Sequence, residues 1–246
     1  MKTISDRQDA YGHEVYDYYC GIGEHEIIER DDGHIDASHG LRRYFAQHAD
    51  WNPQLKQALG RAKGRAIDIG CGPGRVAIHL QNQGMDVLGI DNSPLAIKVA
   101  RLRGLRKARV MSITQVSRRL GIFDTILMCG GNFGLFGGFN RAKALLRRFH
   151  KMTGDGAVII AETRDPYKID DPVHKAYHRR NRRRGRPPAR RMRIRVRYKN
   201  YIGPWFDYLF VSKEEMRKVL EGTGWRVAKF FESGEPEYAV LIEKKK

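Results

Sequence analysis

One short stretch, residues 65–75, constrains the fold more than any other part of the chain. An apolar strand, Arg65–Ile69, leads directly into three glycines at alternate positions, Gly70, Gly72 and Gly74, and a helical pattern starts at once. Glycines permit a sharp backbone turn and let a ligand approach where a Cβ would block it. The following helix N-terminus offers unpaired N–H groups to an electron-rich ligand group. This unit therefore predicts a nucleotide-binding loop between a strand and a helix.

A carboxylate strengthens this interpretation. Asp91 stands 21 residues after Gly70, at the end of a second apolar strand, Asp86–Ile90. An acid in this place can accept both hydroxyls of a ribose. The third glycine comes one position too early for the NAD pattern, Arg75 stands in its place, and the P-loop sequence is absent. The combination indicates an adenosine-type nucleotide other than NAD or a P-loop ligand.

Strand and helix patterns alternate from Gly64 onward. Further strands are expected at 108–111, 123–128 and 156–161, with helices at 76–83, from Ser93-Pro94 to Gly104, and after Asn140. A capping box at 212–215 opens a last helix, and the short polar link ESGEPE joins the runs 225–231 and 238–242. The pattern predicts a parallel α/β sheet with helices on both faces, finished by an antiparallel hairpin.

Two segments lie outside this alternation and suggest a division of the chain. Residues 1–63 are expected to form an N-terminal helical cap, with helices around Leu41–Gln47 and Pro53–Leu59. Residues 64–164 and 211–246 form the nucleotide-binding domain. Residues 165–210 are an insertion, in which 191–198 alternates between arginine and apolar residues and predicts a strand, with a return strand in WFDYLFV.

The positive charge of the chain is concentrated in this insertion. The net charge is +18, and residues 179–199 contribute 12 Lys and Arg and no acid, which leaves +6 elsewhere. The first half of that run, RRNRRRGRPPAR, is expected to be exposed and mobile. The segment has three interpretations: a lid whose arginines bind an anionic small substrate, a nucleic-acid-binding arm, or a solvated surface with no ligand.

The sequence resembles the class I S-adenosylmethionine-dependent methyltransferases of the small-molecule type. The resemblance rests on AIDIGCGPGR, VLGIDNS, FDTILM and the C-terminal hairpin. It implies a Rossmann-like, seven-stranded, mostly parallel sheet, with S-adenosylmethionine as cofactor and S-adenosylhomocysteine as product. It places the methionine part near Asp68 and the glycines, the ribose on Asp91 and the adenine near Ser112. The cofactor-binding residues it implies are Asp68, Gly70, Cys71, Gly72, Gly74, Asp91, Asn92, Ser112 and Cys129.

The catalytic residues are less defined, since methyl transfer requires mainly alignment of the reactants and exclusion of water. Asn132, in a loop similar to those of small-molecule methyltransferases, could hold the cofactor's amino group or the substrate, or could simply form a glycine-rich turn. Glu162 could act as a base or bind a cationic substrate, or could be a surface acid paired with Arg164. Asp68, a buried acid, is expected to bind the amides of its own glycine loop. The N-terminal tyrosines could cover the cofactor or pack within helices; they are Tyr11, Tyr16, Tyr18 and Tyr19.

We therefore expect an enzyme that methylates a small molecule, an anionic one among the options, in the cytoplasm. The alternatives are an RNA methyltransferase that binds phosphates through 179–199, or a non-catalytic nucleic-acid-binding protein on the same fold. No metal-binding pattern or membrane-spanning run is present in the sequence. The three scattered cysteines argue against a disulfide framework and for a reducing compartment.

Overall fold

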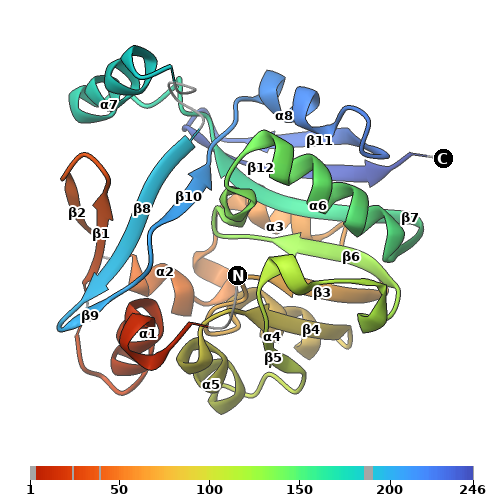
Figure 1. The fold of residues 1–246 in the computed structure, drawn as a ribbon. Coiled ribbons are helices and arrows are strands. Elements are labelled where there is room, and N and C mark those ends of the chain that lie inside the picture. The colour runs from red at the N-terminus through yellow and green to blue at the C-terminus, as the bar shows by residue number, and fades with distance from the viewer. Residues whose placement is uncertain (1–3, 24, 39, 186–190, 246) are drawn as a thin grey trace.

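The computed structural model describes residues 4–23, 25–38, 40–185 and 191–245. Figure 1 shows two β-sheets: a large one at the right, layered between helices, and a smaller one at the left. The large sheet contains seven strands and the smaller one five.

The seven-stranded sheet has the order β11-β12-β7-β6-β3-β4-β5. Its neighbours β5, β4, β3, β6 and β7 pair in parallel, while β12 runs antiparallel to both β7 and β11. This confirms the mostly parallel sheet and the C-terminal hairpin. The strands are β3 (Arg65–Ile69), β4 (Asp86–Asp91), β5 (Ala108–Val110), β6 (Phe123–Met128), β7 (Thr153–Arg164), β11 (Trp225–Glu232) and β12 (Glu237–Lys244).

Helices cover both faces of this sheet, as the alternation of strand and helix predicted. One apolar cluster joins the sheet to α6 (Phe139–Lys151) and α8 (Lys213–Leu220). A second cluster, on the other face, joins it to α3 (Pro53–Leu59), α4 (Arg75–Asn82) and α5 (Pro94–Leu102). The apolar faces of these helices are buried against the sheet. Ligands of such folds therefore bind at the loops that follow the carboxyl ends of the strands.

The smaller sheet brings together two segments that are far apart in the sequence. Its order is β10-β8-β1-β2, with β9 paired to β8. The insertion supplies β8 (Arg191–Tyr198), β9 (Tyr201–Ile202) and β10 (Phe206–Leu209), and the N-terminal segment supplies β1 (Glu26–Arg30) and β2 (Ile35–Ser38). The strand at 191–198 and its return strand are confirmed. The expectation that residues 1–63 are helical is wrong for β1 and β2, which are held in place by pairing with β8.

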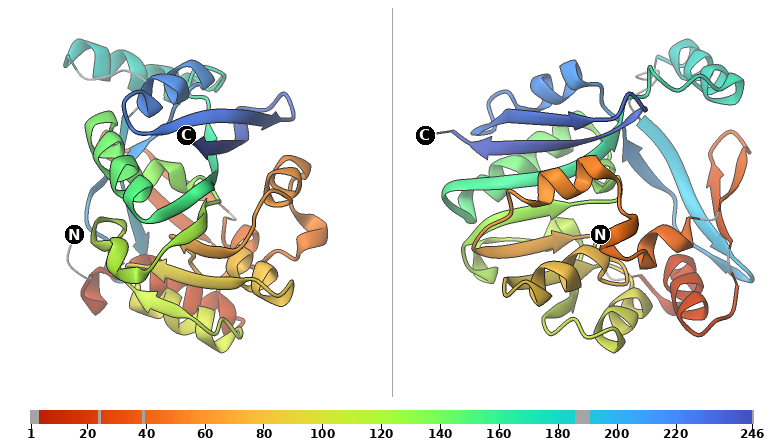
Figure 2. Two further views of the ribbon diagram at one scale, coloured as in Figure 1. Left: turned by 90° about the vertical axis from the view of Figure 1, so that its right-hand side faces the viewer. Right: turned by 180° about the vertical axis from the view of Figure 1, so that it is seen from behind.

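The remaining helices flank the smaller sheet. They are α1 (Ala10–Tyr19), α2 (Leu41–Phe45) and α7 (Pro172–Arg183). Short 3₁₀ turns occur elsewhere along the chain: η1 (Asp6–Gln8), η2 (His48–Asp50), η3 (Ile113–Gln115), η4 (Arg118–Leu120) and η5 (Asn132–Phe136). Both views in Figure 2 show α7 extending outward from the body. The expectation that residues 179–190 are mobile is wrong as far as Arg183, because residues up to Arg183 belong to α7. Residues 186–190 of that segment lie outside the described part of the chain. None of the described helices is long and apolar enough to cross a membrane.

Candidate active site

The glycine loop after β3 is bonded to the end of β4. The N–H groups of Gly70 and Cys71 both donate to the carbonyl of Ile90. The Asp91 carboxylate then accepts the N–H of Gly72 at 3.0 Å and that of Ser93 at 2.9 Å, one on each oxygen. Burial raises the pKa of this carboxyl to about 6, against the effect of these amides. Each carboxylate oxygen keeps further acceptor capacity, so Asp91 is suited to bind ribose hydroxyls while it shapes the loop.

Asp68 lies inside β3 and is almost fully buried. Burial raises its pKa to about 7, opposed by the positive charge of Arg75 and by the N–H of Ala77, which donates to it. The expectation that Asp68 binds the amides of its own glycine loop is therefore wrong, since the amide it accepts comes from α4. The carboxyl faces the first turn of that helix and adds negative charge beside the glycine loop.

The side chain of Tyr11, from α1, lies against the glycine loop. A Cβ at Gly72, where φ is +51°, would lie 2.5 Å from the Tyr11 hydroxyl oxygen, so any larger residue would collide with the tyrosine. The other N-terminal tyrosines lie elsewhere: Tyr16 packs under Lys98, Tyr18 against Phe45, and Tyr19 is exposed. Of the four, Tyr11 is the one in contact with the glycine loop.

Asn132 and Glu162 each hold a loop backbone in place. The Asn132 side-chain nitrogen donates to the carbonyls of Ile69 at 3.0 Å and Gly70 at 2.7 Å, which ties the loop after β6 to the loop after β3. The Glu162 carboxylate accepts the N–H of Gly130 at 2.6 Å, and burial raises its pKa. Both residues reach the carboxyl edge of the sheet and bind loop backbone there. The expectation of a surface pair between Glu162 and Arg164 is wrong, since Arg164 is paired with Glu237.

The other residues implied by the resemblance take varied positions. Cys71 and Cys129 are buried in the apolar cluster under α3, α4 and α5, so only their backbones are available to a ligand. Ser112 caps η3, with its hydroxyl close to the Thr114 side chain and N–H. Asn92 is half-buried, and its N–H helps to hold down the pKa of Asp91.

Tyr208, on β10 of the insertion, contacts the loop after β6, and sequence reasoning missed it. Its hydroxyl donates to the carbonyl of Gly131 at 2.6 Å. Its ring lies so close to Gly134 that a Cβ there would be 2.1 Å from a ring carbon. The smaller sheet is thereby fixed against the carboxyl edge of the large sheet, where ligands of such folds bind.

The arginines of β8 are paired with acids on the neighbouring strands. Arg195 binds Glu29 of β1 through two nitrogens at 2.8 and 2.9 Å, and Arg197 reaches the same carboxylate. Arg191 donates to Asp207 of β10 at 2.5 Å. These pairs confirm that the arginines share one face of the strand. The same guanidinium groups were expected to bind an anionic substrate, and they are instead bonded to carboxylates of the protein itself.

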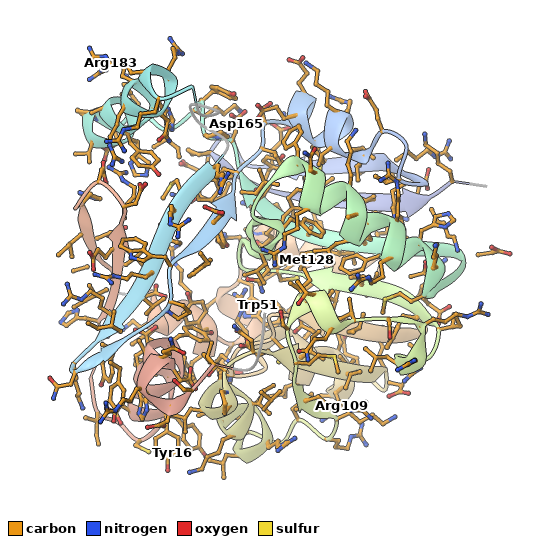
Figure 3. All side chains as sticks on the ribbon, in the orientation of Figure 1. Tyr16, Trp51, Arg109, Met128, Asp165 and Arg183 are labelled. Carbon is orange, nitrogen blue, oxygen red and sulfur yellow. The ribbon has the colours of Figure 1, made fainter. Side chains whose placement is uncertain are left out.

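The outer arginines of α7 lie far from the glycine loops. Figure 3 shows Arg183 at the periphery of the molecule, well apart from Met128, the last residue of β6. Further back along the helix, Arg180 is paired with Asp31. The exposed part of the basic segment is thus separated from the ends of the parallel strands.

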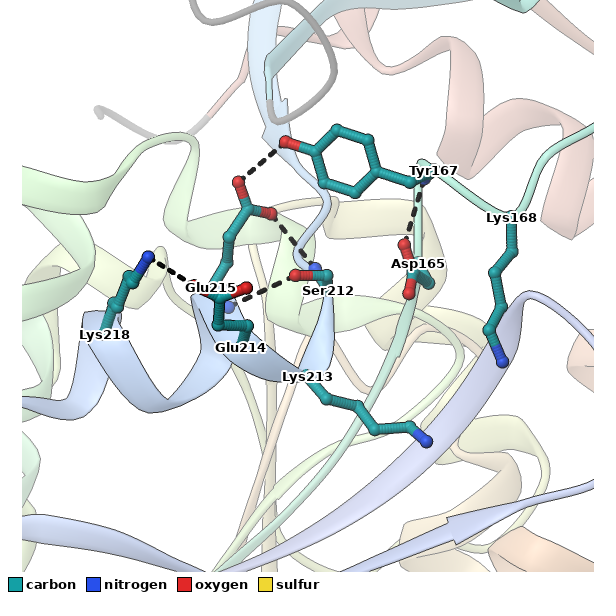
Figure 4. Close-up of a pocket in the computed structure, with 8 residues that line it drawn as sticks. All are labelled: Asp165, Tyr167, Lys168, Ser212, Lys213, Glu214, Glu215 and Lys218. Atoms are coloured by element: carbon teal, nitrogen blue, oxygen red, sulfur yellow. Dashed lines mark hydrogen bonds and ion pairs between the residues drawn. The ribbon is translucent and has the colours of Figure 1, made fainter.

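A surface pocket lies at the base of the insertion, where it leaves β7 (Figure 4). Tyr167 donates to Glu215, whose other oxygen accepts the N–H of Ser212 in the capping box of α8. These bonds anchor the start of the insertion to α8, and we assign the pocket that structural role. Within the described residues, no group of three or more His, Cys, Asp or Glu is placed to hold a metal ion.

Comparisons with known proteins agree that this chain is similar to methyltransferases. A family model described as a methyltransferase domain matches residues 41–229. The putative methyltransferase YqeM of Bacillus subtilis is 22% identical over 128 residues, which are 50% of this chain and 51% of that protein. A ubiquinone biosynthesis O-methyltransferase of Alkalilimnicola ehrlichii is 40% identical over 64 residues, 26% of each chain. The chain therefore spans about half, or less, of these curated relatives.

Solved structures agree on the fold. An S-adenosylmethionine-dependent methyltransferase from Bacteroides fragilis, in complex with S-adenosylhomocysteine, has a TM-score of 0.84 at 22% identity and covers 100% of this chain and 98% of its own. A second such enzyme, from Methanosarcina mazei, has a TM-score of 0.60 at 14% identity and covers 80% and 99%. The chain belongs to the methyltransferase-domain family and has the class I, S-adenosylmethionine-dependent fold that its sequence resembles.

Proposed function

We propose that the protein transfers the methyl group of S-adenosylmethionine to a small molecule held between the carboxyl edge of the large sheet and the smaller sheet. The observation that carries this proposal is the contact of Tyr208 with Gly131 and Gly134. It seats β10, the return strand of the insertion, directly on the loop after β6. An element placed there encloses an acceptor and excludes water, and both effects favour methyl transfer.

The proposed cofactor site uses the residues around the two glycine loops. The cofactor supplies an activated methyl group, and the chain has to bind and orient it. Asp91 has acceptor capacity for ribose hydroxyls, Gly72 allows the Tyr11 hydroxyl to lie against the loop, and Asp68 is suited to attract a cationic part of the cofactor. Asn132 and Glu162 act in this proposal by fixing the loops that surround the methyl group.

The expectation of an anionic acceptor loses the residues on which it rested. It rested on the arginines of residues 179–199, and of these Arg191, Arg195 and Arg197 are bonded to Asp207 and Glu29. A phosphate or carboxylate would have to displace these partners. The same pairing weakens the RNA alternative, because paired arginines are not free to bind phosphates. The outer arginines of α7 are the remaining basic groups that favour RNA.

The experiment is methyl transfer from radiolabelled S-adenosylmethionine to an extract of the source cells, separated by size and treated with RNase. We expect label in the low-mass fraction, insensitive to RNase. Label in a high-mass fraction that vanishes with RNase would replace this proposal by the RNA methyltransferase. Asp91→Ala serves as the control for label that does not depend on the cofactor site.

A further inference from the structure

Two carboxylates outside the cofactor-binding residues lie buried together beside the loops of the active site. Glu14, on α1, is completely buried, and Glu26, the first residue of β1, is 5% exposed. Tyr44 donates to Glu26 at 2.9 Å. Neither oxygen of Glu14 has a hydrogen-bond partner among the residues that the structure describes. A buried carboxylate with no partner is costly, so this site is incomplete without a group that the carboxylate can bind.

The surroundings of Glu14 are acidic and aromatic. Burial raises its pKa, and the nearby carboxylates of Glu26 and Asp9 raise it further. Asp9 is already engaged, since it accepts the Ser93 hydroxyl and the N–H groups of Gly12 and Leu95. Glu14 is therefore the carboxyl of this cluster whose two oxygens have no partner among the described residues. A positively charged ligand group would relieve this repulsion and supply the missing hydrogen bonds.

Aromatic side chains connect this acidic cluster to the loops around the reacting methyl group. Tyr11 and Tyr44 meet edge to face with ring centroids 5.7 Å apart. Burial raises the pKa of both hydroxyls, and the nearby charges of Glu14 and Glu26 raise it further. Tyr11 also touches Gly72. On the other side, the charge of Glu26 acts on Tyr208, which is bonded to Gly131. Rings in such positions offer their faces and hydroxyls to a cation.

We propose that Glu14 and Glu26, with Tyr11, Tyr44 and Tyr208 around them, bind a protonated amine on the methyl acceptor. The inference rests on the proposed small-molecule function and narrows it to amine-bearing acceptors. The cofactor carries an ammonium group too, but its proposed residues lie on β3 and β4. Glu14 and Glu26 belong to the N-terminal segment and the smaller sheet, which cover the edge of the large sheet.

The test is ligand-observed NMR on the protein saturated with S-adenosylhomocysteine, using three aromatic probes of similar size and different charge: benzylamine, benzyl alcohol and benzoate. We expect benzylamine to bind about tenfold or more tightly than the other two, because charge-assisted hydrogen bonds are roughly twice as strong as neutral ones. Glu14→Gln keeps the shape of the side chain and removes its charge. It should lower benzylamine affinity about tenfold and leave the affinity for S-adenosylhomocysteine within about twofold. Glu26→Gln should lower benzylamine affinity in the same direction.

Glu29→Gln is the matched control, because Glu29 lies three residues along β1 and its carboxylate binds Arg195 and Arg197. It should change neither affinity. Absence of benzylamine binding, or equal or tighter binding of benzoate, would overturn the inference. An equal loss of S-adenosylhomocysteine affinity in Glu14→Gln would assign the carboxylate to the cofactor and overturn it too. Label in RNA would instead overturn the proposed function, so the two failures are distinguishable.

Discussion

Replacement of Gly134 by alanine should detach the insertion from the loop after β6. The new Cβ would lie 2.1–2.5 Å from three carbons of the Tyr208 ring, whereas carbon atoms in ordinary contact are about 3.5–4.0 Å apart. The ring must move by more than about 1 Å, which breaks its 2.6 Å hydrogen bond to Gly131. Overpacking costs about 1–3 kcal/mol and the lost bond about 1 kcal/mol, so the free energy of unfolding should fall by about 2–4 kcal/mol.

A double-mutant cycle in urea separates this clash from a general effect of alanine. Tyr208→Phe loses only the hydrogen bond and should cost about 1 kcal/mol. In a Tyr208→Ala background the ring is gone, and Gly134→Ala should cost close to nothing, which gives a coupling energy of about 2 kcal/mol or more between the two positions. If Gly134→Ala costs the same in both backgrounds, Tyr208 does not pack on the loop and the enclosing role of the insertion is refuted.

Three further predictions concern the glycine loops. Asn132→Asp should lower S-adenosylhomocysteine affinity at least about tenfold in calorimetry, because a carboxylate cannot donate to the Ile69 and Gly70 carbonyls; unchanged affinity would show that these bonds are dispensable. Asp68→Asn should raise the free energy of unfolding at pH 8 but hardly at pH 4. The folded pKa of about 7 lies above the ordinary 3.8, so the stability contributed by this carboxyl is lost as pH rises through that window; an equal effect at both pH values would contradict the assignment. For Asp91, with a pKa of about 6, S-adenosylhomocysteine affinity should fall about tenfold from pH 8 to pH 5, where roughly a tenth of the carboxyl is ionised; a flat profile would exclude Asp91 as the titrating group.

The large sheet could be predicted from the sequence because its signals are local. Apolar runs mark each strand, and glycines or caps such as Ser93 and Ser212 mark each helix boundary. The seven strands and the hairpin follow from these signals and the family resemblance. The glycines and Asp91 could be singled out from their positions in the sequence, but the bonds between the two loops, such as that from the Gly72 N–H to Asp91, join residues 19 positions apart.

The smaller sheet and much of the site depend on contacts between distant residues. The strand Glu26–Arg30 is short and mixed in polarity, and its pairing partner Arg191–Tyr198 lies more than 160 residues away. The pattern of WFDYLFV predicted a strand but could not show that Tyr208 meets Gly134. The partners of Asn132, Glu162 and Asp68 were likewise set by packing. A search of the sequence for a short strand with acids to face the arginines of 191–198 could have suggested the pairing of Glu29 with Arg195.

The central claim is that the loops after β3 and β4 bind S-adenosylmethionine through Asp91. Titration calorimetry with S-adenosylhomocysteine tests it most directly, with Asp86→Ala as control because Asp86 begins the same strand and binds Lys107 at the opposite end. We predict binding to the wild-type protein and to Asp86→Ala with equal affinity, and a loss of at least about tenfold in Asp91→Ala, which removes the ribose acceptor and the partner of the Gly72 amide. No binding to the wild type, or equal affinity in Asp91→Ala, would contradict the claim.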